Sequence, residues 1–263
     1  WNGVELMMGC KNTVIPGGVT QIAPYAFAGT AVEKVIIPNS VTRIGTQVFQ
    51  FCDNLTVLHI GSGLTEFDYY GVGYNNELRT QIQNSLGLAS NNLETIVVDE
   101  GNPLIDSRNG CNAIIETATN TLVLASNSTK IPEDVTELAA GAFYACRKLE
   151  SVYIPANLTT IPWGAFDMCS KLESIVVDEA NPVYDSRNNC NAIIETATDT
   201  LLRGCKTTVI PEDVVFIGHY AFSGCQGLEE IVIPDAVHTI GEGAFRNCSH
   251  LRTITFGSGV KSI

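Results

Sequence analysis

The sequence of 263 residues contains no run of eighteen or more apolar residues. Because a helix needs about 20 mostly apolar residues to cross a bilayer, we expect no part of this chain to insert into a membrane. Basic residues are also scarce: 15 lysines and arginines stand against 28 aspartates and glutamates, and the formal net charge is −13. Nucleic-acid binding depends on basic patches that neutralise phosphates, so nucleic acid is disfavoured as a partner. The simplest role of the acidic balance is solubility.

Motifs for catalysis and for cofactor binding are missing as well. The sequence has no G-x-S-x-G, P-loop, G-x-G-x-x-G or H-E-x-x-H motif. No C-x-x-C occurs among the nine cysteines, and the four histidines gather at no common place. We therefore expect no catalytic, cofactor-binding or metal-binding residues, and we expect that the protein is not an enzyme.

An internal repeat of 22 or 23 residues is present instead. Each unit follows the pattern I-P-x-x-V-T-x-I-G-x-x-A-F-x-x-C-x-x-L-x-x-I-x-I, and its start is marked by Ile-Pro at Pro16, Pro38, Pro132, Pro155, Pro211 and Pro234. The L-x-x-I-x-I segment alternates at its end, which predicts a strand with one buried face. Such a strand pairs in parallel with the same strand one coil later, and proline then ends it.

The remaining positions predict the other sides of a coil. V-T-x-I indicates a second short extended segment, and G-x-x-A-F-x-x-C indicates a tight, partly helical corner whose Ala-Phe points inward. We expect Phe143, Phe166, Phe222 and Phe245 to form one continuous internal column. No coil can bury its apolar side alone, so the coils must stack. The fold class predicted is a leucine-rich repeat solenoid, a mainly β right-handed superhelix with short parallel strands and short helical or 3-10 corners.

One solenoid is expected over residues 1–263, with truncated repeats at both ends. We interpret these ends as processing boundaries, so that a signal and an anchor lie outside this segment. A longer period of 79 residues joins two irregular units, 99–130 and 178–209, which share the segment Asn-Ala-Ile-Ile-Glu-Thr-Ala-Thr. Each is expected to hold a hairpin with a four-residue turn, formed by Ala113–Glu116 with Thr121–Leu124 and by Ala192–Glu195 with Thr200–Arg203.

An insertion at 69–92 breaks the repeat. Three tyrosines, Tyr69, Tyr70 and Tyr74, open it, and Leu78, Ile82 and Leu86 then predict an amphipathic helix over Glu77–Leu88 behind Asn76. We expect that deletion of Tyr69–Asn92 spares folding but weakens the binding of any ligand.

All nine cysteines stand at three shared repeat places, one of which is held by Cys111 and Cys190 in the hairpin units. Cys52, Cys146, Cys169, Cys225 and Cys248 share one, where Thr30 also occurs, and Cys10 and Cys205 share another with Ser126. Small, partly polar side chains satisfy these places and no bridge is required. We therefore interpret all nine cysteines as buried free thiols.

These units resemble the BspA-like leucine-rich repeat proteins over nearly the whole chain. The resemblance is carried by Ile210-Pro211-Glu212-Asp213-Val214, Ile217-Gly218, Ala221-Phe222-Ser223-Gly224-Cys225, and the copy from Ile233 to Cys248. It departs at the insertion, and at Ala23, Ala139 and Pro162 in place of glycine. The resemblance implies secreted or surface proteins, mostly of anaerobic mouth and gut bacteria, some of which take part in attachment to host matrix proteins or cells. It supplies no catalytic motif.

The exposed strand face offers the candidate ligand-binding surface. Alternation places Ile36, His59, Val97, Tyr153, Val176, Val232 and Thr255 outward in one row, which either marks recognition or serves strand propensity. We select Tyr69, Tyr70, Tyr74, Tyr153 and His59, because they break the uniformity of the repeat.

Two other features have simpler interpretations. Glutamates at 33, 94, 150, 173 and 229 are interpreted as a solvated edge, with a cation or basic-partner site as the minority view. Loops with Asp106, Asn109 and Asn112, and with Asp185, Asn188 and Asn191, favour Asx-turns over calcium sites.

Two hypotheses of function remain. One is an adhesin-like module, extracellular or on the cell surface, that binds a host matrix protein, a cell-surface protein or a glycan. The alternative is a structural spacer that displays another domain and has no ligand of its own.

Overall fold

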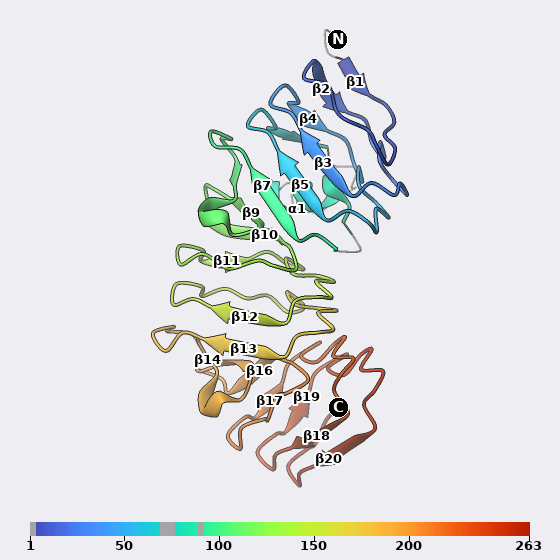
Figure 1. Cartoon of the computed structure of the whole chain (residues 1–263). Coiled ribbons are helices and arrows are strands. Elements are labelled where there is room, and N and C mark those ends of the chain that lie inside the picture. Colours follow the sequence, from blue (N-terminus) through green and yellow to red (C-terminus); the bar gives the residue numbers. More distant parts are fainter. Residues whose placement is uncertain (1–3, 69–76, 89–91) are drawn as a thin grey trace. The chain divides into compact units, whose positions relative to one another are not determined.

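The computed structural model describes residues 4–68, 77–88 and 92–263. The chain divides into two compact units, Trp1–Thr129 and Lys130–Ile263. Within each unit, short coils stack on one another and place their strands side by side (Figure 1). That residues 1–263 form one single solenoid stays a prediction from the sequence.

The first unit contains three sheets. Strands from the L-x-x-I-x-I segment, here called front strands, pair in parallel in the order β3–β5–β7, and strands from the V-T-x-I segment, here called rear strands, pair in the order β1–β2–β4–β6. The hairpin sheet β8–β9–β10 is antiparallel. The elements are β1 (Val4–Leu6), β2 (Val19–Ile22), β3 (Lys34–Ile37), β4 (Arg43–Ile44), β5 (Val57–Ile60), β6 (Glu66–Phe67), α1 (Leu78–Leu86), β7 (Thr95–Val98), β8 (Ile105–Asp106), η1 (Arg108–Gly110), β9 (Ala113–Glu116) and β10 (Thr121–Ala125).

The second unit repeats this plan. Its front strands form two parallel pairs, β12–β13 and β18–β20, and a five-stranded sheet in the order β14–β15–β16–β17–β19 joins the hairpin to two rear strands. The elements are β11 (Glu137–Leu138), β12 (Ser151–Ile154), β13 (Ser174–Val177), β14 (Tyr184–Asp185), η2 (Arg187–Asn189), β15 (Ala192–Glu195), β16 (Thr200–Gly204), β17 (Phe216–Ile217), β18 (Glu230–Ile233), β19 (Thr239–Ile240) and β20 (Thr253–Phe256).

The front strands stack with equal repeat positions opposite each other. Ser151 pairs with Ser174, and Glu230 pairs with Thr253. Exposed and buried side chains alternate along β3, β12 and β18, as expected for a strand with one face on the core. Proline follows each of these strands because it cannot donate to the ladder. The predicted parallel stacking of coils is confirmed.

The Ala-Phe corners are built from successive turns, so the helical character expected there is absent. Among the described residues, 3-10 helix occurs only in the hairpin loops, as η1 and η2. The residue before Ala-Phe has positive φ, and so does the second residue after Phe. Glycine takes the first of these places in some coils, but Tyr25 (φ 59°) and Tyr220 (φ 58°) take it in others. A left-handed side-chain-bearing residue costs about 1 kcal/mol, so the corner geometry outweighs this local preference.

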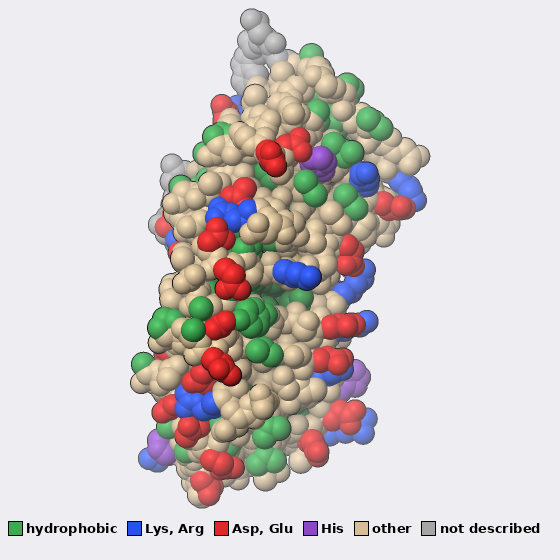
Figure 2. Space-filling view, turned by 60° about the vertical axis from the view of Figure 1, so that its left-hand side comes forward, with side chains coloured by type: hydrophobic (Ala, Val, Ile, Leu, Met, Phe, Trp, Pro, Cys, Tyr) green, Lys and Arg blue, Asp and Glu red, His purple; other side chains and the backbone are tan. Residues whose placement is uncertain are grey.

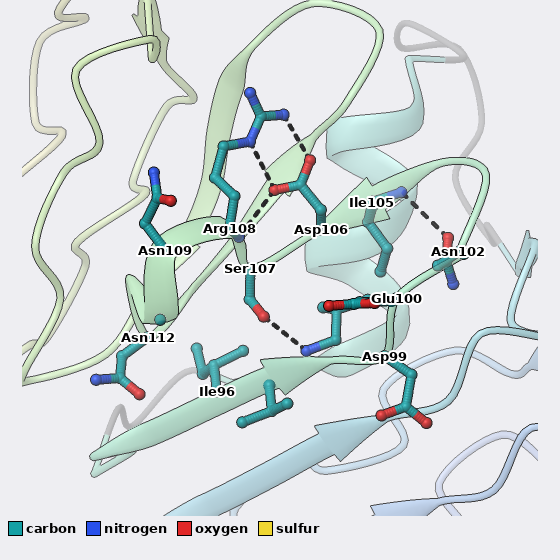
Figure 3. Close-up of a pocket in the computed structure, with 14 residues that line it drawn as sticks. Ile96, Asp99, Glu100, Asn102, Ile105, Asp106, Ser107, Arg108, Asn109 and Asn112 are labelled. Atoms are coloured by element: carbon teal, nitrogen blue, oxygen red, sulfur yellow. Dashed lines mark hydrogen bonds and ion pairs between the residues drawn. The ribbon is translucent and has the colours of Figure 1, made fainter.

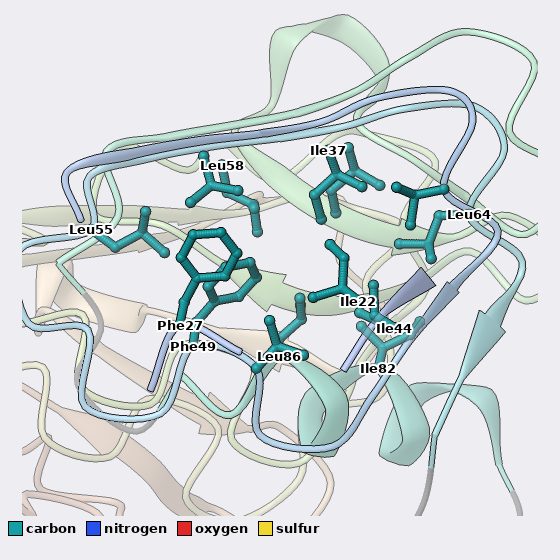
Figure 4. Close-up of a cluster of buried hydrophobic side chains, with 14 of the residues drawn as sticks. Ile22, Phe27, Ile37, Ile44, Phe49, Leu55, Leu58, Leu64, Ile82 and Leu86 are labelled. Carbon is teal, nitrogen blue, oxygen red and sulfur yellow. The ribbon is translucent and has the colours of Figure 1, made fainter. Parts of the chain in front are cut away.

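Phenylalanines of the corners fill the space between coils in the first unit. Phe27 and Phe49 are fully buried, and their ring centroids lie 5.5 Å apart (Figure 4). Beyond Phe49 the helix α1 takes over: the N–H groups of Val48 and Phe49 donate to the carbonyls of Ser85 and Leu86 at 2.8 and 3.0 Å. The end of α1 therefore replaces the corner of the next coil.

The insertion is thus part of the core. Ile82 and Leu86 of α1 are fully buried, and the predicted amphipathic helix is confirmed over Leu78–Leu86, with Glu77 as its N-cap. Asn76 lies outside the described residues. This packing contradicts the expectation that deletion of Tyr69–Asn92 spares folding, since removal of α1 would uncover the ring of Phe49.

In the second unit the phenylalanine rings form two separate pairs. Phe143 stacks on Phe166 at 4.7 Å, and Phe222 stacks on Phe245 at 5.2 Å. No ring contact joins Phe166 to Phe222, so the expected continuous column is wrong. At this place the backbone of the hairpin coil packs directly against the ring of Phe222. A Cβ atom added to Gly204 would lie only 2.3 Å from that ring. A coil without a corner therefore interrupts the column.

Both predicted hairpins are present. Strand β9 pairs with β10, and β15 pairs with β16, each across a four-residue turn. An asparagine fixes the entry to each hairpin: Asn102 Nδ2 donates to the Leu64 carbonyl at 2.9 Å, and its Oδ1 accepts the N–H of Ile105 at 3.1 Å. Asn181 makes the equivalent bonds to Leu158 and Tyr184, both at 2.9 Å.

All nine cysteines are free thiols. Those that follow the corner hydrogen-bond to the preceding coil: Cys52 Sγ donates to the Phe27 carbonyl at 3.0 Å, and Cys169 Sγ to that of Phe143 at 3.2 Å. Burial raises the pKa of Cys169 to about 12. The expectation that every thiol is buried is wrong for Cys10, which is exposed, and for Cys248, which is half-buried.

Candidate functional site

An exposed row crosses the front strands of the first unit. Ile36, His59 and Val97 stand directly opposite one another in β3, β5 and β7. Ile36 is 47% exposed and Val97 is 38% exposed. In the second unit, Tyr153 lies opposite Val176, and these side chains are 44% and 46% exposed. The predicted outward row is present within each unit, and it is apolar apart from its two rings and Thr255.

Each unit couples a ring of this row to a carboxylate. His59 Nε2 lies 2.5 Å from Asp99 Oδ1, and the hydroxyl of Tyr153 donates to Asp178 Oδ2. Asp99 and Asp178 occupy equal places of the 79-residue period, one residue after β7 and β13. We call His59–Asp99 and Tyr153–Asp178 the ring–carboxylate pairs. They give an apolar row a polar end that can both donate and accept hydrogen bonds.

The tyrosine pair changes the ionisation of both partners. Its hydrogen bond to the Asp178 carboxylate raises the pKa of Tyr153 to about 12. The same bond, together with the N–H of Ala180, lowers the pKa of Asp178. At neutral pH the pair therefore consists of a neutral phenol and a negative carboxylate.

A groove of about 740 Å³ lies beside Asp99 in the first unit. The end of β7 forms one wall, and the loop through η1 forms the other, as Figure 3 shows. The Val98 N–H donates to Ser107 Oγ at 2.8 Å and ties the two walls together. Because Asp99, Glu100 and Asp106 line it, the groove combines acidic groups with the apolar floor of Ile96 and Ile105.

The carboxylate of Asp106 is already occupied. Arg108 Nε donates to Asp106 Oδ1 at 2.8 Å, and Arg108 Nη2 donates to Oδ2 at 2.5 Å. Burial opposes ionisation of Asp106, but the bonds from Arg108 and Thr117 outweigh it, so the pKa of Asp106 is lowered. The Arg108 N–H also donates to Asp106 Oδ1 at 3.0 Å, which confirms the Asx-turn interpretation.

The second unit repeats this arrangement with more negative charge. Arg187 binds Asp185 at 2.7 Å through Nη2, and its Nη1 also binds Asp199 at 2.7 Å and Asp213 at 2.8 Å. In the first unit the place of Asp199 is taken by Asn120, whose Oδ1 accepts from Arg108 at 2.9 Å. Within the described ranges, no group of three or more metal-ligating side chains is suited to an ion.

The glutamate edge behaves as an ordinary charged surface where its partners are known. Lys11 pairs with Glu33 at 2.8 Å, and Lys206 pairs with Glu173. Figure 2 shows acidic side chains interspersed with fewer basic ones, as expected of a chain with a strongly negative charge.

Sequence reasoning missed a cluster of three rings in the second unit. The ring centroid of Trp163 lies 6.2 Å from that of Phe216 and 5.4 Å from that of His219, both in edge-on contact. The side chain of Trp163 is 45% exposed. The signal available was Pro162-Trp163 in place of the usual glycine after isoleucine. The predicted Tyr69, Tyr70 and Tyr74 lie outside the described residues, so of the five candidates the structure places His59 and Tyr153, one in each unit.

The family model of the BspA type leucine rich repeat region matches residues 7–99, 115–198 and 199–263, in six copies. The chain belongs to this family. The BspA-type repeat accounts for the coils described above, and the fold is a leucine-rich repeat solenoid. Proteins of this family are bacterial surface or secreted proteins and are generally non-enzymatic binding proteins.

Solved structures with similar repeats come from other bacteria. A leucine rich cell surface protein from Faecalibacterium prausnitzii is 23% identical, with 99% of this chain and 71% of that chain covered and a TM-score of 0.53. The pneumococcal vaccine antigen PcpA is 17% identical, with coverage of 97% and 68% and a TM-score of 0.48. A leucine-rich repeat protein from Eubacterium ventriosum is 19% identical, with coverage of 94% and 67% and a TM-score of 0.48.

No curated protein matches the BspA-type chain. In the part of the chain that the structure describes, no helix combines the length and the apolar character needed to span a membrane. At 23% identity, the Faecalibacterium prausnitzii structure supports the fold alone.

Proposed function

We propose that this chain is a secreted or cell-surface recognition module that attaches, like an adhesin, to a host protein or a glycan through its front strands. The observation that carries the proposal is the repetition of the ring–carboxylate pair. His59–Asp99 and Tyr153–Asp178 stand at equal places of two units that differ in many other surface residues.

The chemistry of these pairs suits recognition. Tyrosine and histidine present an apolar body with a polar tip, and such rings are common anchors of binding surfaces. Beside them lie exposed β-branched side chains, Val97 next to His59 and Val176 next to Tyr153. The groove next to Asp99 adds further acceptors, which suit the hydroxyls of a glycan or the N–H groups of a protein.

The test is a binding screen of the whole chain against immobilised matrix proteins and a glycan array. For any ligand found, His59→Ala and Tyr153→Ala should each weaken binding at least about fivefold, the usual effect of losing an anchor residue. His238→Ala and Tyr144→Ala are matched controls, because each removes an exposed ring of the same type away from the front strands.

Equal effects of the two pairs of variants would contradict the front face as the binding surface. The alternative, a spacer without a ligand, is favoured if the screen finds no ligand while a domain fused to either end of the chain is displayed normally. The exposed rings of Tyr153 and Trp163 argue against a uniformly polar exterior, which the spacer hypothesis expects.

A further inference from the structure

The front sheet of the first unit begins at an open edge. Strand β3 is the first of its sheet and pairs only with β5. The preceding coil offers no strand there. It forms a turn instead, in which the Cys10 N–H donates to Thr13 Oγ1 at 2.7 Å and the Thr13 N–H donates to the Cys10 carbonyl at 3.1 Å.

The backbone of β3 presents unpaired groups at this edge. The carbonyls of Glu33 and Ile37 face β5, where they accept from Val57 at 3.3 Å and from Gly61 at 2.8 Å. Peptide groups alternate sides along a strand, so the N–H and C=O of Lys34 and Ile36 point the other way. Among the described residues, no backbone hydrogen bond involves Lys34 or Ile36 on that side.

A groove of about 500 Å³ lies along this edge, between β3 and the turn. Its two walls are apolar at their rims, because Val14 is 84% exposed and Ile36 is 47% exposed. At one end of the groove, Lys11 Nζ forms a salt bridge with Glu33 Oε1 at 2.8 Å. Lys34 has no ion-pair partner among the described residues, so the groove offers one positive charge beside a row of free donors and acceptors.

We propose that the β3 edge binds an extended polypeptide segment as an added strand, with an acidic side chain of that segment opposite Lys34. Only a main chain supplies N–H and C=O groups at the spacing of a strand edge, and the exposed Val14 and Ile36 then contact its alternate side chains. The charge of Lys34 selects the acidic residue. This proposal is independent of the ring–carboxylate pairs.

The second unit contains a matched comparison. Strand β18 also begins a sheet, and the Cys205 N–H donates to Thr208 Oγ1 at 2.7 Å in the turn before it. Val209 and Val232 stand in the places of Val14 and Ile36 and are 74% and 65% exposed. Glu230 replaces Lys34, so this edge should reject an acidic segment that β3 accepts.

The probes are two fluorescent peptides of alternating threonine and valine, one with a central aspartate and one with a central lysine, titrated into the whole chain. The acidic peptide should bind and should shift the backbone amide NMR signals of Lys34 and Ile36. Ile36→Pro removes the outward N–H without touching the bonds to β5, and should weaken binding about tenfold; Ile36→Val should leave it unchanged. Lys34→Glu should reverse the preference between the two peptides.

Three results would overturn the proposal. They are the absence of binding by the acidic peptide, amide shifts confined to residues outside β3, or equal affinity of a peptide whose central N–H groups are methylated. The NMR and methylation measurements use the unaltered protein, so they decide the question even if Ile36→Pro unfolds. His59→Ala should leave the peptide affinity unchanged, which separates this site from the proposed function.

Discussion

The two hairpin-bearing coils, one in each unit, share one frame and differ in what fills it. Asn102 and Asn181 make the same bonds, and so do the pairs Asp106–Arg108 and Asp185–Arg187. Among the positions that differ, two change charge within the coils, Leu124 against Arg203 and Asn120 against Asp199, and one lies in the front strand that precedes each coil's own, His59 against Tyr153. The comparison teaches that side chains bonded to the backbone hold the coil, while the residues around them can change in size and charge.

The most severe of these differences is buried. Leu124 pairs with Ile114 in the first hairpin, and Arg203 pairs with Ile193 in the second. Arg203 is only 4% exposed, and its Nη1 donates to the Ser223 carbonyl at 3.0 Å, but its Nε has no hydrogen-bond partner. A buried guanidinium that lacks one hydrogen bond lowers the free energy of unfolding, because its desolvation is incompletely compensated. The first hairpin has Leu124 at this place, so the coil does not require an arginine.

The largest expected effect comes from moving the charge into the first hairpin. Leu124→Arg should lower the free energy of unfolding by about 3–5 kcal/mol, because it buries a charge among apolar residues of the core. Urea unfolding measures this loss. The control Leu124→Met keeps the volume and should cost less than about 1.5 kcal/mol. A loss below that value for Leu124→Arg would mean that the first hairpin can also solvate a guanidinium.

The reverse change should have a smaller effect of opposite sign. Arg203→Leu restores the residue of the first hairpin and should raise the free energy of unfolding by about 1 kcal/mol, since a well-packed apolar side chain replaces an incompletely bonded charge. Arg203→Lys keeps the charge but loses the planar fork, so it should destabilise the protein. Destabilisation by both variants would show that the bonds to Tyr220 and Ser223 outweigh the burial of the charge.

Acid should weaken the aspartate–arginine pairs. In Asp185, burial opposes ionisation but the bonds from Arg187 outweigh it, and the pKa is lowered. The stability from this pair is therefore complete above the ordinary carboxyl pKa of about 3.9, and is lost as the pH falls through the lower folded value. Asp185→Asn should remove about 1 kcal/mol near neutral pH and flatten the acid side of a pH series of urea midpoints. Glu212→Gln, an exposed neighbour, should leave the series unchanged.

The smallest expected effect is a difference in thiol reactivity between Cys10 and Cys205. These two cysteines occupy the same repeat position, which Ser126 occupies in the first hairpin unit. Cys205 is buried and Cys10 is exposed, and the hydrogen bond from Thr13 lowers the pKa of Cys10. A thiol reagent should therefore label Cys10 of the native protein first, with no change in stability. Cys10→Ser should abolish the fast reaction, whereas Cys205→Ser should not. Fast labelling of Cys205 would mean that the second hairpin opens readily.

Much of the fold follows from the sequence because the repeat sets it locally. Pro132 and Pro155 are one repeat of 23 residues apart, and this spacing predicts which strands stack. The apolar positions Leu78, Ile82 and Leu86 predict the helix. The ring–carboxylate pairs could not be predicted from the spacing alone, since Asp99 lies 40 residues from His59 and Asp178 lies 25 residues from Tyr153. The insertion lengthens the first separation, so the two pairs share no common spacing along the chain.

Other features were hidden by residue type. An arginine near the end of a hairpin strand is expected at the surface, yet Arg203 is only 4% exposed and its Nη1 donates to the Ser223 carbonyl at 3.0 Å. The cluster of Trp163, Phe216 and His219 joins segments on either side of a hairpin coil, which no short pattern links. In the corners, the left-handed places accept tyrosine as well as glycine, so glycine alone does not mark them.

The front and rear of the second unit are connected differently. The front ladder stops at β13 and begins again at β18, while the rear strands β17 and β19 continue the sheet of the hairpin without a break. On the front, the ladder of strand hydrogen bonds is therefore interrupted at the hairpin. On the rear, the ladder continues through the hairpin strands, so that these strands are expected to open together. Local opening events on the front can stay confined to two strands, and the rear sheet holds the neighbouring coils together while a front pair exchanges its amide protons with water.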